Sequence, residues 1–210
     1  MEKMTRKEKS AATKEKIFST AAELIKQKGY DHVTVSEICS NAGIAKGSFY
    51  VHYHSKEDII RESYYTDLGT YVKNRYTTFL QEVPAASGCE RIFRFLSLEL
   101  EFAEFAGYEL TCLAYMLNLG TCIPGPSEHL QKRDFSRILY QEIVNCMDEA
   151  HTDFSAADVF AYFESMVRGI MATWCFSNHG FHMKNTGTKF LAYAVRSIFP
   201  SFVHTDLQEI

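Results

Sequence analysis

The chain of 210 residues is 46 % apolar and 23 % charged, with 11 glycines and 4 prolines. This composition excludes a mostly disordered or collagen-like chain, and the length is sufficient to bury a substantial core. Residues 1–56 carry a net charge of +4 and residues 57–210 a net charge of −8, so either the N-terminal quarter meets a polyanion or it is a solvated basic tail.

Helical spacing of apolar residues dominates the chain, and no alternating stretch is long enough to predict a sheet. A first helix is predicted near 13–28, with Gly29 as its C-terminal stop. Thr34 and Glu37 have the spacing of a capping box, so a short second helix should begin at Val35.

Further turn and cap signals place the remaining helices. Gly43 tolerates the turn that ends the second helix, and a third short helix should run from about Ala45 to His52. Ser55 and Asp58 form another cap, and the apolar stripe behind it predicts a fourth helix over about 56–82. Five more helices are expected near 88–106, 108–119, 127–150, 156–179 and 184–199. The predicted fold class is therefore all-α, with about nine helices.

Residues 34–53 have the pattern of a helix-turn-helix, with a capped helix, a glycine turn and a second short helix. The residues predicted to pack inward on the first helix are Ile38, Ala42, Ile44, Phe49 and Tyr53. Lysine, serine and tyrosine side chains on the outward face can bind phosphates or base edges, and Gly47 lets the backbone approach the groove. Amides at the capped start of the second helix can also bind a phosphate. The predicted DNA contacts are Thr34, Ser36, Ala45, Lys46, Gly47, Ser48, Tyr50, Val51, His52 and Lys56.

The stretch GIAKGSFYVHYHSKEDI, residues 43–59, resembles the signature of tetracycline-repressor (TetR) family regulators. The resemblance extends over roughly residues 13–60 and implies a homodimeric, all-helical transcription factor with a ligand pocket in its body. It also implies that Tyr50 and Lys56 contact phosphates, while Lys46, Gly47 and Ser48 lie nearest the bases. Tyr53 stands where the family usually has phenylalanine, and Ala45 stands where a serine or threonine often caps the recognition helix.

On this basis we expect a helix-turn-helix DNA-binding domain at 1–55 and a helical effector-binding and dimerisation domain at 56–210. The expected function is that of a repressor, released from a palindromic operator in double-stranded DNA by a small, mostly apolar effector. The residues expected to line the effector pocket are Phe102, Phe105, Cys112, Tyr115, Met116, Tyr140, Ile143 and Met147. The residues expected at the interface of the homodimer are Phe160, Phe163, Val167, Met171, Trp174, Phe190, Ala194 and Ile198.

Sequence motifs of enzymes are absent. The chain has no P-loop, dinucleotide-binding glycine motif, nucleophile elbow or HExxH helix, so we predict neither an enzyme nor a cofactor. An all-helical enzyme whose site is assembled from distant helices is the alternative that a single sequence leaves open. A second alternative is a redox-sensing regulator that uses Cys112, Cys122 or Cys146, although reduced and buried cysteines are the common case.

Metal binding, export and membrane insertion are not predicted either. The six cysteines form no CxxC motif, and the helical spacing of Cys175, His179 and His182 fits solvated histidines better than a metal site. The first ten residues lack the apolar core of a secretory signal. The most membrane-like segment, 159–176, is interrupted by Glu164 and Arg168, whereas a spanning helix needs about 20 apolar residues. We therefore expect a cytoplasmic protein without a transmembrane helix.

Overall fold

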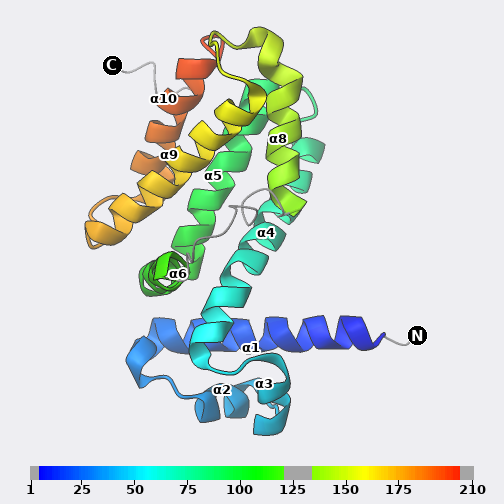
Figure 1. Cartoon of the computed structure of the whole chain (residues 1–210), viewed down its shortest axis with the longest axis vertical. Helices are drawn as coiled ribbons and strands as arrows, with labels where there is room; N and C mark the ends of the chain where they lie inside the picture. Colours follow the sequence, from blue (N-terminus) through cyan, green and yellow to red (C-terminus); the bar gives the residue numbers. More distant parts are fainter. Residues whose placement is uncertain (1–4, 121–133, 204–210) are drawn as a thin grey trace. The chain divides into compact units, whose positions relative to one another are not determined.

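The computed structural model describes residues 5–120 and 134–203, and these residues form helices joined by turns (Figure 1). Within these ranges there are nine α-helices and no strand, which confirms the predicted all-α class. The helices are α1 (Arg6–Lys28), α2 (Val35–Ala42), α3 (Lys46–His52), α4 (Lys56–Glu82), α5 (Gly88–Ala106), α6 (Tyr108–Gly120), α8 (Asp134–Cys146), α9 (Ala156–Phe176) and α10 (Thr188–Ile198).

Packing divides the described chain into two compact units. The first unit contains α1, the 3₁₀ turn η1 (Tyr30–His32), α2, α3, α4 as far as Asp67, and α6. The second contains the rest of α4, then α5, α8, the 3₁₀ turn η2 (Met147–Glu149), α9, the π-helical turn η3 (Met183–Gly187) and α10. The division by packing thus groups the start of α4 and all of α6 with α1, α2 and α3, whereas the functional boundary expected between residues 55 and 56 stays a prediction.

Helix α1 begins seven residues earlier than predicted. The Thr5 hydroxyl accepts the Glu8 amide at 3.3 Å, and the Glu8 carboxylate accepts the Thr5 amide at 2.7 Å. This capping box satisfies two amides that a helix start otherwise leaves without partners. The later part of α1 contributes Ile17, Phe18 and other apolar side chains to the core of the first unit.

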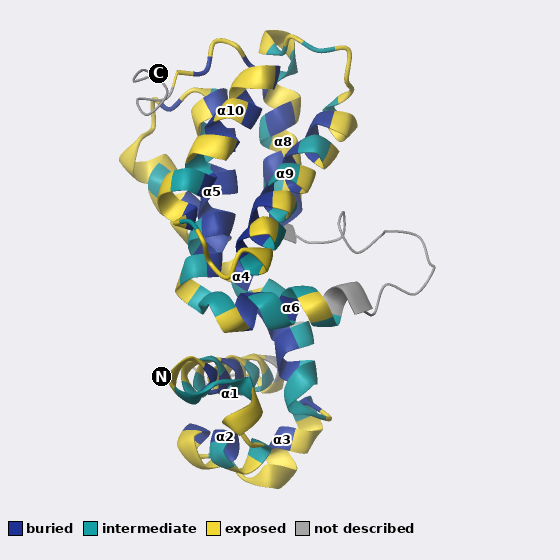
Figure 2. Cartoon of the chain, turned by 90° about the vertical axis from the view of Figure 1, so that its left-hand side faces the viewer, coloured by how far each residue is buried: buried dark blue, intermediate teal, exposed yellow. Residues whose placement is uncertain are grey.

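The core of the second unit is built around α5, and Figure 2 shows buried residues concentrated along α5, α9 and α10. Phe95 of α5 stacks on Phe135 of α8, with ring centres 6.2 Å apart. At the end of the same helix pair, the Glu142 carboxylate accepts from the Arg91 guanidinium at 2.8 Å and from the Tyr76 hydroxyl at 2.9 Å. One carboxylate thus joins α8 to both α5 and α4.

The C-terminal helices end where the backbone leaves the helical region. Helix α9 stops at Phe176 instead of 179, since Asn178 and His179 adopt φ values of 51° and 47°. His179 and His182 therefore lie beyond the helix, and the helical face that would have joined them to Cys175 does not exist. Helix α8 gives way to η2 before residue 150, and the expected start near 127 lies outside the described residues. No described helix is both long and apolar enough to cross a membrane.

Candidate nucleic-acid interface

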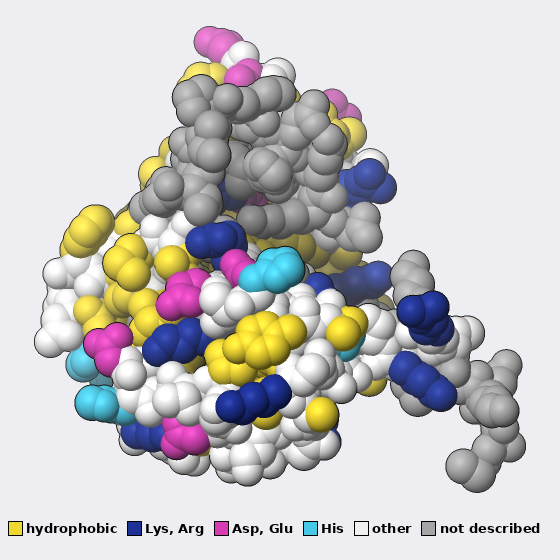
Figure 3. Space-filling view, turned by 60° about the horizontal axis from the view of Figure 1, so that its bottom comes forward, with side chains coloured by type: hydrophobic (Ala, Val, Ile, Leu, Met, Phe, Trp, Pro, Cys, Tyr) yellow, Lys and Arg dark blue, Asp and Glu magenta, His cyan; other side chains and the backbone are white. Residues whose placement is uncertain are grey.

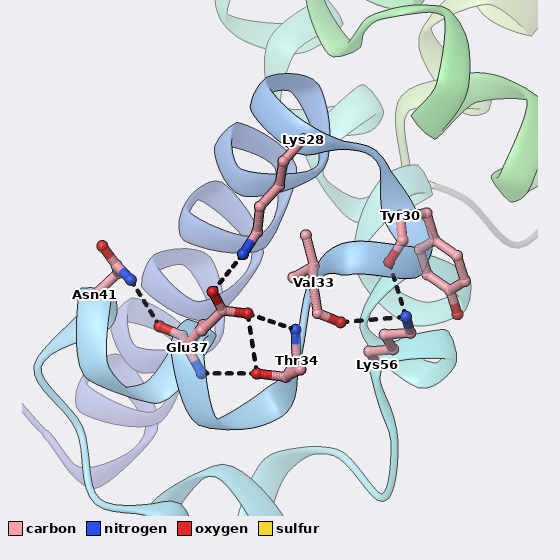
Figure 4. Close-up of polar contacts among 7 residues, drawn as sticks. All are labelled: Lys28, Tyr30, Val33, Thr34, Glu37, Asn41 and Lys56. Atoms are coloured by element: carbon pink, nitrogen blue, oxygen red, sulfur yellow. Dashed lines mark hydrogen bonds and ion pairs between the residues drawn. The ribbon is translucent and has the colours of Figure 1, made fainter.

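The predicted capping box at the start of α2 is confirmed and is drawn in Figure 4. The Thr34 hydroxyl accepts the Glu37 amide at 3.3 Å, and the Glu37 carboxylate accepts the Thr34 amide at 3.1 Å. Lys28, in the last turn of α1, forms an ion pair with the same carboxylate. Its hydrogen bond, together with those from Thr34, lowers the pKa of Glu37. The ionised Glu37 thus connects the start of α2 to the end of α1.

The turn between α2 and α3 requires glycine. Gly43 has φ 61° and ψ 40°, the left-handed conformation that residues with a Cβ rarely adopt. Its amide donates to the Ser40 carbonyl at 3.2 Å, and the Ile44 amide donates to the Cys39 carbonyl at 3.0 Å. These bonds satisfy the last carbonyls of α2 and set the direction in which α3 leaves the turn.

The inward face of α3 is buried as predicted. Phe49 is 0 % and Tyr53 is 1 % exposed, and Ile38 and Ala42 of α2 are also buried, whereas Ile44 is only partly buried. The Tyr53 hydroxyl forms a 2.5 Å hydrogen bond with the hydroxyl of buried Ser63 in α4. A buried hydroxyl without such a partner would be costly, so Ser63 explains why tyrosine is accepted at this position.

The outward face of α3 lies open to solvent. Tyr50 is 54 % and Val51 is 80 % exposed, and Figure 3 shows hydrophobic, basic, acidic and histidine side chains together on this side of the molecule. Of the predicted DNA contacts, Thr34, Ser36, Ala45, Lys46, Gly47, Ser48, Tyr50 and Val51 are exposed, and His52 and Lys56 are partly exposed. A Cβ at Gly47 would meet no atom within 4 Å, so the backbone is accessible there. All ten predicted residues are therefore at least partly accessible to solvent.

Lys56 has intramolecular partners that sequence reasoning did not find. Its ammonium donates to the Tyr30 carbonyl at 2.8 Å and to the Val33 carbonyl at 3.2 Å, and it lies 3.9 Å from the centre of the Tyr30 ring (Figure 4). The next residue, Glu57, accepts a 2.5 Å hydrogen bond from the Tyr30 hydroxyl, which lowers the pKa of Glu57. The start of α4 is thus bonded to the segment between α1 and α2. A phosphate contact by Lys56 stays a prediction.

A second carboxylate reaches the same segment from α6. Glu109 accepts the Tyr30 amide at 2.6 Å. The two residues are separated by 79 positions, so no local pattern could have indicated the contact. Segment Tyr30–His32 is therefore bonded to both α4 and α6 within the first unit.

The residues predicted for an effector pocket are divided between the two units. Cys112, Tyr115 and Met116 lie on α6 in the first unit, while the other five belong to the second. Phe102 and Ile143 are buried, Phe105, Met116 and Tyr140 are exposed, and Cys112, Tyr115 and Met147 are partly exposed. Their common role in ligand binding stays a prediction.

Most residues predicted for the dimer interface are buried within a single chain. Seven of them are no more than 8 % exposed: Phe160, Phe163, Val167, Met171, Trp174, Ala194 and Ile198. For example, Phe163 stacks on Phe199, with ring centres 6.3 Å apart, and the Trp174 indole donates to the Phe181 carbonyl at 3.0 Å. Only Phe190, which is 49 % exposed, offers a large surface. An interface on α9 and α10 would therefore have to use other residues of these helices.

The cysteine environments give little support to a thiol sensor. Burial, together with a smaller contribution from nearby Cys89, raises the pKa of Cys146 to about 11, so the reactive thiolate is scarce at neutral pH. Cys112 is partly exposed, and Cys122 lies outside the described residues. Over the ranges 5–120 and 134–203, no three His, Cys, Asp or Glu side chains are grouped as metal ligands.

Comparison with known proteins finds a match for the N-terminal part of the chain. Residues 17–62 match the family model of bacterial regulatory proteins, tetR family. The HTH-type transcriptional regulator YerO of Bacillus subtilis is 45 % identical over 47 residues, which are 22 % of this chain and 16 % of YerO. The biofilm operon icaADBC negative transcriptional regulator IcaR of Staphylococcus epidermidis is 44 % identical over 50 residues, 24 % of this chain and 27 % of IcaR. The matches thus span less than a third of these relatives.

The fold likeness extends over most of the chain. The crystal structure of the transcriptional regulator FadR from Bacillus subtilis, in complex with stearoyl-CoA, superposes with a TM-score of 0.63 at 20 % identity and covers 88 % of this chain and 98 % of FadR. At this identity the likeness is one of fold. The matched family consists of regulatory proteins and not of enzymes, which agrees with the prediction that the chain is not an enzyme. Residues 17–62 thus identify this part of the chain with the tetR family of bacterial regulatory proteins.

Proposed function

We propose that the chain is a transcriptional repressor that binds a near-palindromic operator as a homodimer and leaves it when a small, mostly apolar effector binds. The observation that carries the proposal is the exposed face of α3, supported from behind by buried Phe49 and Tyr53. One helix of seven residues reads only a few base pairs. Useful specificity therefore requires two copies, about 34 Å apart on successive major grooves.

Two substitutions on α3 test the DNA-binding surface. Tyr50→Phe removes one hydroxyl and should weaken binding roughly tenfold, the value of one hydrogen bond to a charged phosphate. Lys46→Ala should weaken binding and reduce the salt dependence of the affinity by about one phosphate contact. Fluorescence anisotropy with a duplex selected by the parent chain from a random library, at several salt concentrations, measures both effects.

The matched control for these variants is Lys26→Ala. Lys26 is also an exposed lysine, but it lies in the last turn of α1 and not on α3. This control should bind as the parent does. If Lys46→Ala and Tyr50→Phe also bound like the parent at physiological salt, α3 would not be the DNA-reading helix. A parent chain that binds generic duplex without salt dependence would favour the enzyme alternative over the regulator.

The proposed homodimer is supported by an exposed face of α9. The residues that the sequence predicted for the interface are mostly buried within one chain and support it less well. Ala161, Ser165, Gly169 and Thr173 recur every four residues and are all exposed. Small side chains at this spacing form one helical face along which a second helix can pack closely. On α10, Tyr193 is 48 % exposed and adds apolar surface to that of Phe190.

Gly169→Leu is expected to weaken the dimer. A Cβ at Gly169 meets no atom of its own chain within 4 Å, so the substitution should leave the monomer folded while separating two apposed helices. Light scattering at micromolar concentration should show a shift from dimer toward monomer. Thr77→Leu, which adds leucine to an exposed position of α4, is the control and should remain dimeric. A parent chain that is monomeric under these conditions would contradict the proposed dimer.

We expect the effector to be mostly apolar, because the residues predicted to bind it are rich in phenylalanine, tyrosine and methionine. FadR, which shares the fold, binds stearoyl-CoA in its crystal structure, and this makes a long-chain acyl thioester the first compound to test. We expect stearoyl-CoA, and not free CoA, to raise the thermal midpoint of the chain and to release bound duplex. If stearoyl-CoA and free CoA raised the thermal midpoint and released the duplex equally, the chain would bind the nucleotide part of CoA and not the apolar acyl chain.

A further inference from the structure

The N-terminal half of α1 continues beyond the core of the first unit. Of residues 5–16, none whose side chain is described is buried, whereas Ile17, Phe18, Ala21 and Ile25 in the next three turns are all buried. We call Arg6–Lys16 the basic arm. It spans about 15 Å at the usual helical rise, and Figure 1 shows α1 extending past α2 and α3 toward the N-terminus. Contact with the core therefore does not explain why this part of the chain is helical.

The charges of the basic arm are not explained by folding either. Residues 6–16 contain five lysines and arginines and two glutamates. Positive charges in the first turns of a helix oppose its dipole, so Arg6 and Lys9 disfavour the helix that carries them. Arg6, Lys9 and Lys16 are exposed, and none of them forms an ion pair with an acidic group in the described part of the chain. Lys28, at the other end of α1, is by contrast paired with Glu37.

The base of the basic arm lies beside the helix-turn-helix. The Lys16 ammonium is 3.8 Å from the position that a Cβ at Gly43 would occupy, which places it at the turn between α2 and α3. The Lys14 ammonium lies 5.1 Å from the centre of the Tyr53 ring, at the end of α3. The base of the basic arm thus lies next to α3, which carries Lys46, within the same unit.

We propose that the basic arm is a second DNA-binding element, which contacts backbone phosphates next to the base pairs that α3 reads. Its partner is the duplex itself, because exposed cations repeated along one preformed helix complement a phosphate backbone with one charge per about 3.4 Å of each strand. Such contacts position the protein and add affinity without reading sequence. The inference rests on the proposed function and adds to it a surface outside residues 34–56.

The test removes the three exposed cations together, as Arg6→Gln, Lys9→Gln and Lys16→Gln. Glutamine keeps a good helix propensity, and far-UV circular dichroism checks that α1 is retained. Affinity is measured by fluorescence anisotropy between 50 and 200 mM salt, with a duplex selected by the parent chain and with a scrambled duplex of equal length. The slope of log affinity against log salt should become shallower by about 3 per chain. Binding should weaken by the same factor, roughly tenfold or more at 0.1 M salt, on both duplexes.

The matched control is Lys26→Gln, Lys73→Gln and Lys184→Gln, which changes the net charge equally at exposed positions outside the arm. We expect this control to keep the parental slope. If the arm variant kept the slope of the control, or lost affinity for the selected duplex alone, the inference would be overturned while the proposed function stood. A parent chain that binds neither duplex would overturn both.

Discussion

Replacing Phe49 by alanine is expected to lower the free energy of unfolding of the first unit by about 3–5 kcal/mol. Phe49 is 0 % exposed, so the substitution removes a complete aromatic side chain from the core behind α3 and leaves a cavity. Urea unfolding followed by circular dichroism measures the loss. DNA binding should also disappear, because α3 keeps its orientation only while its inner face is packed.

The neighbouring aromatic residue provides the matched control. Tyr50 is 54 % exposed and touches Phe49 edge-on, with ring centres 5.3 Å apart. Tyr50→Ala should therefore cost about 1 kcal/mol or less of stability, yet it should weaken duplex binding strongly. Comparing Phe49→Ala with Tyr50→Ala therefore distinguishes a loss of stability from a loss of DNA contacts at two adjacent positions. Equal losses of stability in the two variants would show that the inner and outer faces of α3 have been assigned wrongly.

Replacing Lys56 by methionine is expected to destabilise the first unit by about 2–3 kcal/mol. The variant keeps the length of the side chain but removes the ammonium that donates to the Tyr30 and Val33 carbonyls. Hydrogen bonds from a charged donor contribute about 1.5–3 kcal/mol each, and this side chain is only partly buried. Thermal and urea unfolding measure the effect.

Lys46→Met is the control, since Lys46 is an exposed lysine on α3. It should change the salt dependence of DNA binding and leave the stability almost unaltered. The same salt titration of Lys56→Met determines whether Lys56 also contacts a phosphate, because each lost phosphate contact reduces the slope by about 0.9. Unchanged stability of Lys56→Met would contradict the intramolecular role that its two hydrogen bonds indicate.

The sequence predicted well those features that depend on neighbouring residues. The Thr34–Glu37 capping box, the left-handed turn at Gly43 and the inward positions of Phe49 and Tyr53 all follow from spacings of four residues or fewer, and the structure confirms them. The early start of α1 at Arg6 was missed although its capping box, Thr5 and Glu8, has the same local pattern.

The C-terminal half shows where local patterns are insufficient. An apolar stripe on α9 predicts that one face of the helix is buried. It does not tell whether that face packs inside one chain or against a second chain. The structure places Phe163 and Trp174 inside the chain and leaves Ala161, Ser165 and Gly169 outside. Which helices cover a stripe depends on the paths of the other helices, and that information is spread over the whole chain.

The sequence by itself determined the helical class, the helix-turn-helix and the residues on the outer face of α3, because helix periodicity and capping are encoded within one or two turns. Only the tertiary structure decided that Lys56 and Glu109 bind the Tyr30 segment, across 26 and 79 positions. It also decided that α6 packs against α1. A hydrogen bond between distant positions leaves no periodic trace in either segment, since each partner is chosen by the geometry of the folded chain and not by its neighbours in sequence.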